Sequence, residues 1–277
     1  MKDRVRISLT LRPEIVELLD SKIDGTKIRN RSHAVEQFLK QALFSPAGQA
    51  VILVGDEEKI LTDICGETVL EKTLSRLNKA GIKKIVLCCK PSSRKLAKFL
   101  QKKKFSHFRF IWTKNEGKGT AAALMQCKKE LDPETFLFFY GDILAELDVY
   151  DFVDFHISHN RLATMVITSV ADPLPWGIVK VKRNRVTDFF EKPTPTKALD
   201  SRLTNLINAG IYAFQPEIFG YITKQTKNLE TDVVPKLIKE QQLYSYLLDG
   251  AWFNISRDDL LAHALKYCTP KKRQKKV

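Results

Sequence analysis

Apolar runs that alternate with amphipathic helices constrain the fold of residues 49–268 more than any other feature of the chain. The runs at 50–55, 83–89 and 135–143 have the length and composition of strands buried on both faces. Helical patterns at 68–81 and 119–131 separate them. This order predicts a Rossmann-like, mostly parallel α/β sheet, with any ligand beyond the carboxyl ends of its strands.

A different pattern occupies residues 1–44, ahead of the breakers Pro46 and Gly48. Apolar and polar side chains alternate from residue 4 to residue 12, which is typical of a half-buried strand. Helical spacing follows from Pro13 to about Gly25, and Asn30 is a suitable N-cap for a second helix. One strand and two helices bury too little surface to fold alone, so we expect two copies to pair their strands.

This β-α-α pattern resembles the ribbon-helix-helix family over residues 3–43. The resemblance implies a homodimer, with a tetramer left open, and duplex DNA as the partner. The ribbon would enter the major groove, and the start of the second helix would hold a phosphate. The alternative is a dimerisation module without a DNA role. The residues implied in DNA binding are Arg4, Arg6, Ser8, Thr10, Asn30, Arg31 and Ser32.

The net charge of +14 is concentrated in two places. Nine bases and no acid lie between Lys83 and Lys104, and five more bases lie in the tail 269–277. Such blocks attract polyanions, although a solvated surface explains either one equally well. The chain has no apolar run long enough for a membrane span, no signal-peptide core and no C-x-x-C pair, so we expect a cytoplasmic protein with no membrane partner.

Eight stretches, in the family's order, resemble the sugar-1-phosphate nucleotidyltransferase (NDP-sugar pyrophosphorylase) family between about residues 50 and 265. The resemblance implies a glycosyltransferase-A-like fold and the attack of a sugar-phosphate oxygen on the α-phosphorus of a nucleoside triphosphate. The stretches are AVILVG, LNKAGIKKIVL, EGKGTAAAL, FYGDIL, ATMVITSVADPLPWGIVKV, RVTDFFEKP, LINAGIYAF and DGAWFNIS.

On the sugar side, the resemblance assigns a role to each motif residue. Trp176 and Gly177 would line the sugar. Glu191 would accept its hydroxyl groups, and Lys192 would reach its phosphate. The turn Asn208-Ala209-Gly210 would lie beside the ring.

On the nucleotide side, Gly55 would begin the phosphate loop, Gly119 and Thr120 would contact the base, and Asp142 would bind Mg²⁺. Here the chain departs from the family, because Gly55-Asp56-Glu57-Glu58-Lys59-Ile60-Leu61 stands where the family has G-G-x-G-T-R-L. Carboxylates in this loop repel a triphosphate, and Lys59 is the candidate to replace the lost arginine. The second metal aspartate is replaced by Asn254, a weaker ligand for Mg²⁺.

These departures affect triphosphate and metal handling but spare the sugar side. The sequence therefore favours a transcription regulator whose nucleotidyltransferase-like domain binds a sugar phosphate or nucleotide sugar as effector, with catalysis lost or weak. One alternative is an active sugar-1-phosphate nucleotidyltransferase that also binds DNA. Another is a structural dimer that retains neither activity.

Overall fold

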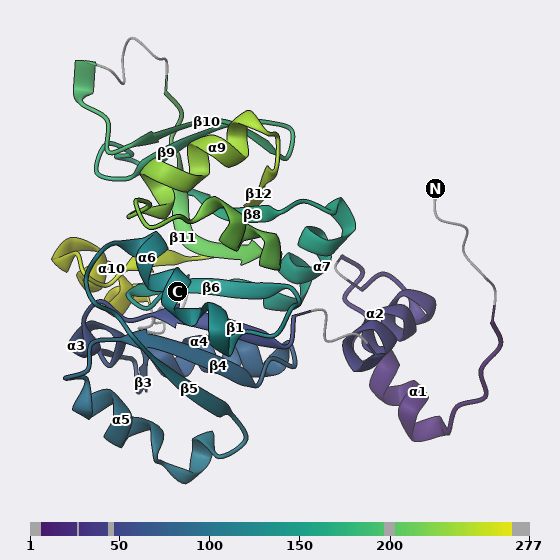
Figure 1. Ribbon diagram of the computed structural model, residues 1–277. Helices are drawn as coiled ribbons and strands as arrows, with labels where there is room; N and C mark the ends of the chain where they lie inside the picture. The colour runs from purple at the N-terminus through teal and green to yellow at the C-terminus, as the bar shows by residue number, and fades with distance from the viewer. Residues whose placement is uncertain (1–6, 27, 44–46, 197–202, 268–277) are drawn as a thin grey trace, which may run out of the picture. The chain divides into compact units, whose positions relative to one another are not determined.

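The computed structural model describes residues 7–26, 28–43, 47–196 and 203–267 (Figure 1). The chain separates into two compact units, Met1–Ser45 and Pro46–Val277. Among the described residues, no helix is both long and apolar enough to cross a membrane.

The first unit contains two helices, α1 (Pro13–Asp20) and α2 (Arg31–Leu43). Both oxygens of Asp20 accept hydrogen bonds from the Arg31 guanidinium, at 2.7 Å each, and Asn30 Oδ1 accepts the His33 N–H at 2.9 Å. No side chain of α1 is buried. Residues 7–12 form no strand, and residues 1–6 lie outside the described part of the chain. The predicted strand is therefore not formed over residues 7–12, where no described segment pairs with the backbone.

The second unit is built on a nine-stranded sheet in the order β5-β4-β1-β6-β11-β8-β12-β10-β9. Four neighbouring strands, β5, β4, β1 and β6, are parallel to one another. Their bounds are β1 (Gln49–Leu53), β4 (Lys84–Cys89), β5 (Arg109–Lys114) and β6 (Phe136–Tyr140). This half of the sheet matches the predicted parallel arrangement.

The other half differs from the prediction of a mostly parallel sheet. β11 runs antiparallel to both β6 and β8, and β9 and β10 form an antiparallel hairpin, while β12 is parallel to β8. A short connection between consecutive strands, such as that from β9 to β10, forces them to be antiparallel, whereas a parallel pair needs a long crossover. The bounds are β8 (Ala163–Ser169), β9 (Gly177–Lys182), β10 (Arg185–Glu191), β11 (Leu206–Phe214) and β12 (Leu243–Leu247).

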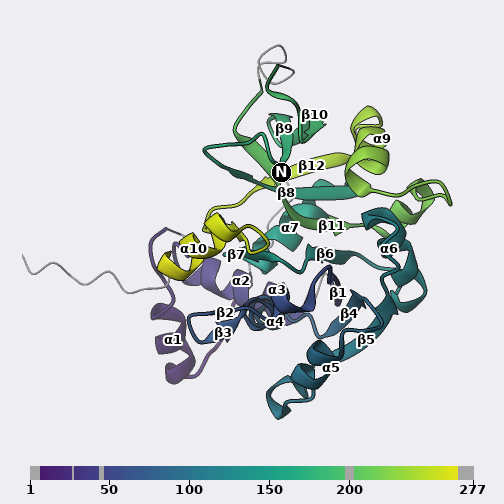
Figure 2. The ribbon, with the colours of Figure 1, turned by 90° about the vertical axis from the view of Figure 1, so that its left-hand side faces the viewer.

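Helices cover both faces of the sheet (Figures 1 and 2). One face packs against α4 (Val69–Lys79), α5 (Arg94–Leu100) and α7 (Val149–His159). The other packs against α6 (Thr120–Cys127) and α9 (Val234–Lys239). β1 shows why both faces are covered, since Ile52 belongs to one apolar cluster and Val51 to the other.

Short elements complete the second unit and shape the ends of its strands. α3 (Glu57–Ile60) and the hairpin of β2 (Asp63–Ile64) and β3 (Glu67–Thr68) follow β1. β7 (Ile143–Ala145) pairs with β13 (Trp252–Asn254), ahead of α10 (Asp258–Tyr267). Short helical segments lie at Lys103–Phe105 (η1), Lys128–Glu130 (η2), Pro216–Tyr221 (η3) and Leu229–Val233 (η4).

Candidate active site

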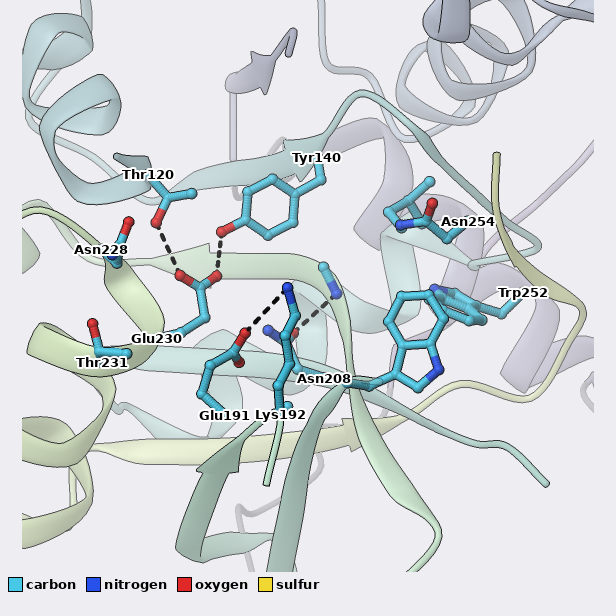
Figure 3. A pocket seen from close by; sticks show the side chains of 14 residues that line it. Thr120, Tyr140, Glu191, Lys192, Asn208, Asn228, Glu230, Thr231, Trp252 and Asn254 are labelled. Atoms are coloured by element: carbon cyan, nitrogen blue, oxygen red, sulfur yellow. Dashed lines mark hydrogen bonds and ion pairs between the residues drawn. The ribbon is translucent and has the colours of Figure 1, made fainter. Parts of the chain in front are cut away.

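Two adjoining pockets lie beyond the carboxyl ends of the parallel strands, and they share Thr120 and Tyr140. The first pocket has a volume of about 390 Å³, and apart from Ala209 it brings together the residues that the sequence assigned to the sugar side (Figure 3). Its lining is Thr120, Tyr140, Ile143, Trp176, Gly177, Glu191, Lys192, Asn208, Gly210, Asn228, Glu230, Thr231, Trp252 and Asn254.

Glu230 fixes the wall between the two pockets. Thr120 Oγ1 donates to Glu230 Oε2 at 2.9 Å, and the Tyr140 hydroxyl donates to Oε1 of the same carboxylate (Figure 3). Thr120 Oγ1 also accepts the Leu229 N–H at 2.8 Å. Burial, reinforced by the Glu230 charge, raises the pKa of Tyr140 well above its usual value, so this hydroxyl remains a donor.

Glu191 and Lys192 lie together at the end of β10. The Lys192 Nζ is 3.8 Å from Glu191 Oε1, and the lysine side chain is mostly exposed whereas the glutamate is mostly covered. Burial and the nearby Glu230 carboxylate raise the pKa of Glu191, while Lys192 opposes them. The pair therefore presents a carboxylate that can accept hydroxyl hydrogens beside a cation that can reach a phosphate.

Gly177 makes room for the Glu191 carboxylate at the start of β9. A Cβ at this position would lie 2.4 Å from the Phe189 ring and 2.8 Å from Glu191 Oε2. Contacts this short are not tolerated without a shift of the ring or the carboxylate. A larger residue would therefore displace the Phe189 ring or the Glu191 carboxylate, and Gly177 leaves both in place.

A bulge in β11 carries Asn208 and Gly210 into the first pocket. The pairing of β11 with β8 shifts register between Asn208 and Tyr212, and Gly210 has a left-handed φ of +76°. Asn208 Oδ1 accepts the Gly210 N–H at 2.9 Å, and its amide donates to the Tyr212 hydroxyl at 2.6 Å. Bulges of this kind redirect side chains beside sites.

Two tryptophans close the far side of the first pocket. The rings of Trp176 and Trp252 meet edge to face at 5.1 Å, and Trp252 Nε1 donates to the Ala209 carbonyl at 2.9 Å. The Arg257 guanidinium lies over the Trp176 ring at 5.4 Å. Trp176 is therefore held rigidly as an apolar wall.

The second pocket has a volume of about 370 Å³ and contains the residues that the sequence assigned to the nucleotide, namely Gly55, Gly119 and Thr120. Gly119 has φ +110°, and a Cβ there would lie 2.3 Å from the Lys227 carbonyl oxygen. A Cβ at Gly55 would meet nothing within 4 Å. The complete lining is Leu53, Gly55, Asp56, Asn115, Gly117, Gly119, Thr120, Tyr140, Asp142 and Ser256.

The acidic loop after β1 mostly turns away from the second pocket. Glu57 Oε2 accepts the Leu96 N–H of α5 at 3.0 Å, and Glu58 pairs with Lys95 of the same helix. Asp56 caps α3 by accepting the Glu58 N–H at 2.9 Å, and of the three acids it alone lines the pocket. The expected cluster of carboxylates at the triphosphate position is therefore reduced to one.

Lys59 lines neither pocket and lies 3.9 Å from Asp258 Oδ1. The basic block 83–104 is also partly paired, since Lys84 contacts Asp132 and Lys104 contacts Glu71. The tail 269–277 lies outside the described residues.

The donors available for Mg²⁺ are Asp142 and its neighbours. Ser256 Oγ donates to Asp142 Oδ2 at 2.7 Å, which leaves Oδ1 for a cation. Asn254 lines the first pocket, and its Oδ1 accepts the Ser256 N–H at 2.9 Å. The amide oxygen of Asn254 is therefore already used within the turn. Within the described ranges, no group of three histidine, cysteine or acidic side chains could hold a metal by itself. One carboxylate fits a Mg²⁺ ion that arrives with phosphate oxygens, because such ions commonly use few protein ligands.

The sequence missed Tyr140 and Glu230, which join the two pockets. Tyr140 is the last residue of β6, immediately before Gly141-Asp142, and this position could have identified it. Glu230 lies in η4, a turn with π-helical hydrogen bonds, and such turns often occur at sites. The spacing of 90 residues between the two gives no local signal.

The residues predicted to contact DNA all belong to the first unit, and some of them lie outside the described residues. Arg4 and Arg6 precede the described residues, and Ser8 and Thr10 are exposed. Asn30, Arg31 and Ser32 are at the start of α2, where Arg31 is held by Asp20.

The nucleotidyl transferase family model matches residues 56–268. Mannose-1-phosphate guanyltransferase beta-A of Xenopus laevis is 28% identical over 205 residues, which make up 72% of this chain and 55% of that protein. Mannose-1-phosphate guanyltransferase 2 of Candida glabrata is 29% identical over 212 residues, or 74% and 57% of the two chains. The chain thus spans about half the length of these curated relatives.

Solved structures show the same fold. UDP-glucose pyrophosphorylase from Acinetobacter baumannii superposes with a TM-score of 0.69 at 18% identity, covering 80% of this chain and 93% of that one. HddC from Yersinia pseudotuberculosis gives 0.66 at 19% identity, covering 80% and 99%.

These relatives correct the prediction of a DNA-binding regulator with lost or weak catalysis. Their names are those of guanyltransferases and a pyrophosphorylase, and the family match begins after the first unit. The prediction was wrong because it placed all the loop carboxylates against the triphosphate, whereas α5 engages Glu57 and Glu58. With its family match over most of its length and its pockets beyond the parallel strands, the chain belongs to the nucleotidyl transferase family.

Proposed function

We propose that this chain is an active sugar-1-phosphate nucleotidyltransferase, which converts a nucleoside triphosphate and a sugar 1-phosphate into a nucleotide sugar and pyrophosphate. The observation that carries the proposal is the pair of adjoining pockets that share Thr120 and Tyr140. Two substrates bound side by side lose the entropy of encounter before they react.

The first pocket supports the sugar 1-phosphate as its occupant. Glu191 would accept sugar hydroxyl groups, and Lys192 would contact the phosphate. The tryptophan wall supports an apolar ring face of the sugar, as is common in such pockets. The names of the guanyltransferase relatives support a hexose 1-phosphate such as mannose 1-phosphate.

The second pocket supports the triphosphate. Gly119 and Thr120 line it at the start of α6, where the Lys227 carbonyl accepts the N–H groups of Ala121 and Ala122 and so holds this wall in place. In the reaction, a phosphate oxygen of the sugar 1-phosphate bonds to the α-phosphorus, and the bond from that phosphorus to the bridging oxygen of pyrophosphate breaks. No protein group has to gain or lose a proton in this exchange, so the chain acts by positioning. A Mg²⁺ ion, which Asp142 would hold, supplies neutralisation of phosphate charge when bound.

Pyrophosphate release tests the proposal. The full chain is incubated with Mg²⁺, each of the four common nucleoside triphosphates and a panel of hexose 1-phosphates. We expect turnover on the order of 1 per second for at least one pair, and a kcat/KM about 10- to 100-fold lower in Glu230→Gln purified in parallel, which excludes a contaminating enzyme. A folded wild-type chain that releases no pyrophosphate above that variant with any pair contradicts the proposal.

We also propose that two copies pair through the first unit. The alternating side chains Ile7, Leu9 and Leu11 are 64%, 54% and 40% exposed. If the same segment of a second copy lay beside them, the two segments would pair as strands and cover these apolar side chains. Light scattering after gel filtration is the test. We expect a dimer for the full chain and for Ser8→Lys on the opposite face, but a monomer for Leu9→Lys. A monomeric wild-type chain contradicts it.

A further inference from the structure

A third pocket lies at the turn of the β9–β10 hairpin, and we call it the hairpin pocket. Its volume is about 420 Å³, and its lining is His159, Lys182, Arg183, Asn184, Arg185 and Tyr244. The hairpin pairs Arg185 with Lys182 at the turn and Glu191 with Gly177 at the other end. Strands rise about 3.3 Å per residue, so roughly 20 Å separate the hairpin pocket from the first pocket.

The lining of the hairpin pocket carries three full positive charges and no carboxylate. Arg185 Nη1 donates to the neutral Gln241 Oε1 at 2.6 Å. Within the part of the chain that the structure describes, no acid forms an ion pair with any of the three cations. Elsewhere on the domain, cations such as Lys84 and Lys95 have acidic partners. Three unneutralised cations around one concave surface favour an anion.

A fourth cation, Arg161, contacts Tyr244 but is not among the residues that line the pocket. The Arg161 guanidinium lies over the Tyr244 ring at 5.3 Å, and its buried Nε has no hydrogen-bond partner. This guanidinium adds positive charge near the pocket, which favours an anion there. The His159 ring packs on the same tyrosine at 5.3 Å.

The frame of the pocket is already in place. Arg183 adopts a left-handed φ of +57° at the turn, and the Asn184 carbonyl accepts the Ser245 N–H at 2.7 Å. His159 Nδ1 lies 2.8 Å from the Phe155 carbonyl, which makes Nδ1 the protonated nitrogen and leaves Nε2 for another partner. A ligand would therefore meet a turn whose backbone is already ordered.

We propose that the hairpin pocket binds a small phosphorylated ligand with a di- or triphosphate group. Guanidinium groups match phosphate oxygens in pairs, and two of the three lining cations are arginines. The volume is that of a small-molecule site. This site is separate from the proposed active site, and its occupancy does not depend on whether the chain is an enzyme.

Titration calorimetry of the full chain with inorganic tripolyphosphate, at low ionic strength and without Mg²⁺, tests the proposal. The double variant Lys182→Gln/Arg183→Gln should lose a binding event that wild type shows, with affinity at least tenfold weaker. Lys98→Gln/Lys103→Gln removes the same charge from exposed lysines on α5 and η1, at the opposite edge of the sheet, and should bind as wild type does. Melting temperature without ligand verifies that both variants are folded.

Arg185→Lys separates a specific site from general attraction, because it keeps the charge but loses the paired geometry. We expect at least a threefold weaker affinity for this variant. The proposal is overturned if Lys182→Gln/Arg183→Gln binds tripolyphosphate as tightly as wild type does, or if both charge-matched double variants weaken binding equally. Pyrophosphate release, where present, should be unchanged in all three variants.

Discussion

The first and second pockets differ in how firmly their surroundings define them. In the first pocket, Gly177 leaves no room for a Cβ, and Asn208 is fixed by bonds on both sides of its amide. In the second, Gly119 is as tightly enclosed as Gly177, but in the loop after β1 a Cβ on Gly55 meets nothing, and Asp56 is an exposed cap. A loop of the second pocket could therefore change its sequence without disturbing the fold, whereas a change in the first pocket displaces a neighbour.

The largest expected effect is a glycine exchange that contrasts the two pockets. Gly177→Ala should lower kcat/KM by about 100-fold or more, because it pushes Glu191 or the Phe189 ring out of place. Gly55→Ala, the matched control in the second pocket, should stay within about threefold of wild type. Steady-state pyrophosphate release, with both substrates varied, measures kcat/KM for the two variants. Similar losses in both variants would show that the pockets are equally rigid.

The shared wall should give the next largest effect. Glu230→Gln replaces the carboxylate that accepts from Thr120 and Tyr140, and charge-assisted hydrogen bonds are worth about 1.5–3 kcal/mol each. We expect kcat/KM to fall by about 10- to 100-fold. Glu240→Gln is a close control, because Glu240 also accepts from a tyrosine hydroxyl, that of Tyr221, but lies outside both pockets. If the two variants had the same kcat/KM, Glu230 would have no role in the active site.

An intermediate effect should appear in the pH dependence of the first pocket. Because burial raises the pKa of Glu191 above 4.5, the accepting carboxylate is lost at a higher pH than for an ordinary glutamate. The KM for sugar 1-phosphate should rise up to about tenfold per pH unit below that pKa. The Glu191→Gln variant should have a higher KM for sugar 1-phosphate, and this KM should not change over the same pH range. A wild-type KM that is equally flat contradicts the assigned role of this carboxylate.

The raised pKa of Glu191 affects the stability of the fold in the opposite direction from substrate binding. A carboxyl group with a raised folded-state pKa stabilises the fold fully below its unfolded pKa, and this contribution is lost as pH rises through the folded value. The melting temperature of wild type relative to Glu191→Gln should therefore fall as pH rises through this window, while sugar phosphate binding improves. Thermal melts of both proteins across the window measure the difference.

The smallest expected effect concerns the charge of the second pocket. Asp56→Asn keeps a good capping residue but removes the one loop carboxylate that lines the pocket. The KM for the triphosphate should fall about two- to fivefold, the range for an exposed charge. Glu58→Gln, whose side chain pairs with Lys95 on α5, should change it less. A larger effect at Glu58 would mean that the loop turns inward when substrate binds.

The sequence predicted the parallel half of the sheet, and the residues that it assigned to the sugar side lie together in the first pocket, because both leave local patterns. The apolar runs of β1, β4 and β6 and the motifs around Trp176, Glu191 and Asn208 are short and contiguous. It failed where the outcome depends on distant partners. The direction of Glu57 and Glu58 is set by α5, and the contact of Tyr140 with Glu230 forms only when β6 and η4 meet. The strand predicted in residues 4–12 likewise needs a partner that a single copy does not contain.

Thr120 belongs to both pockets and to one carboxylate, and this has a consequence for how substrate preference can change. Its methyl and hydroxyl groups form part of a common partition, so a substitution there alters the shape of two compartments at once. Under the proposed function, selectivity for the sugar and selectivity for the base would then change together at this position. New pairings of sugar and base would have to arise at residues that only one compartment contains, such as Trp176 on one side and Asn115 on the other.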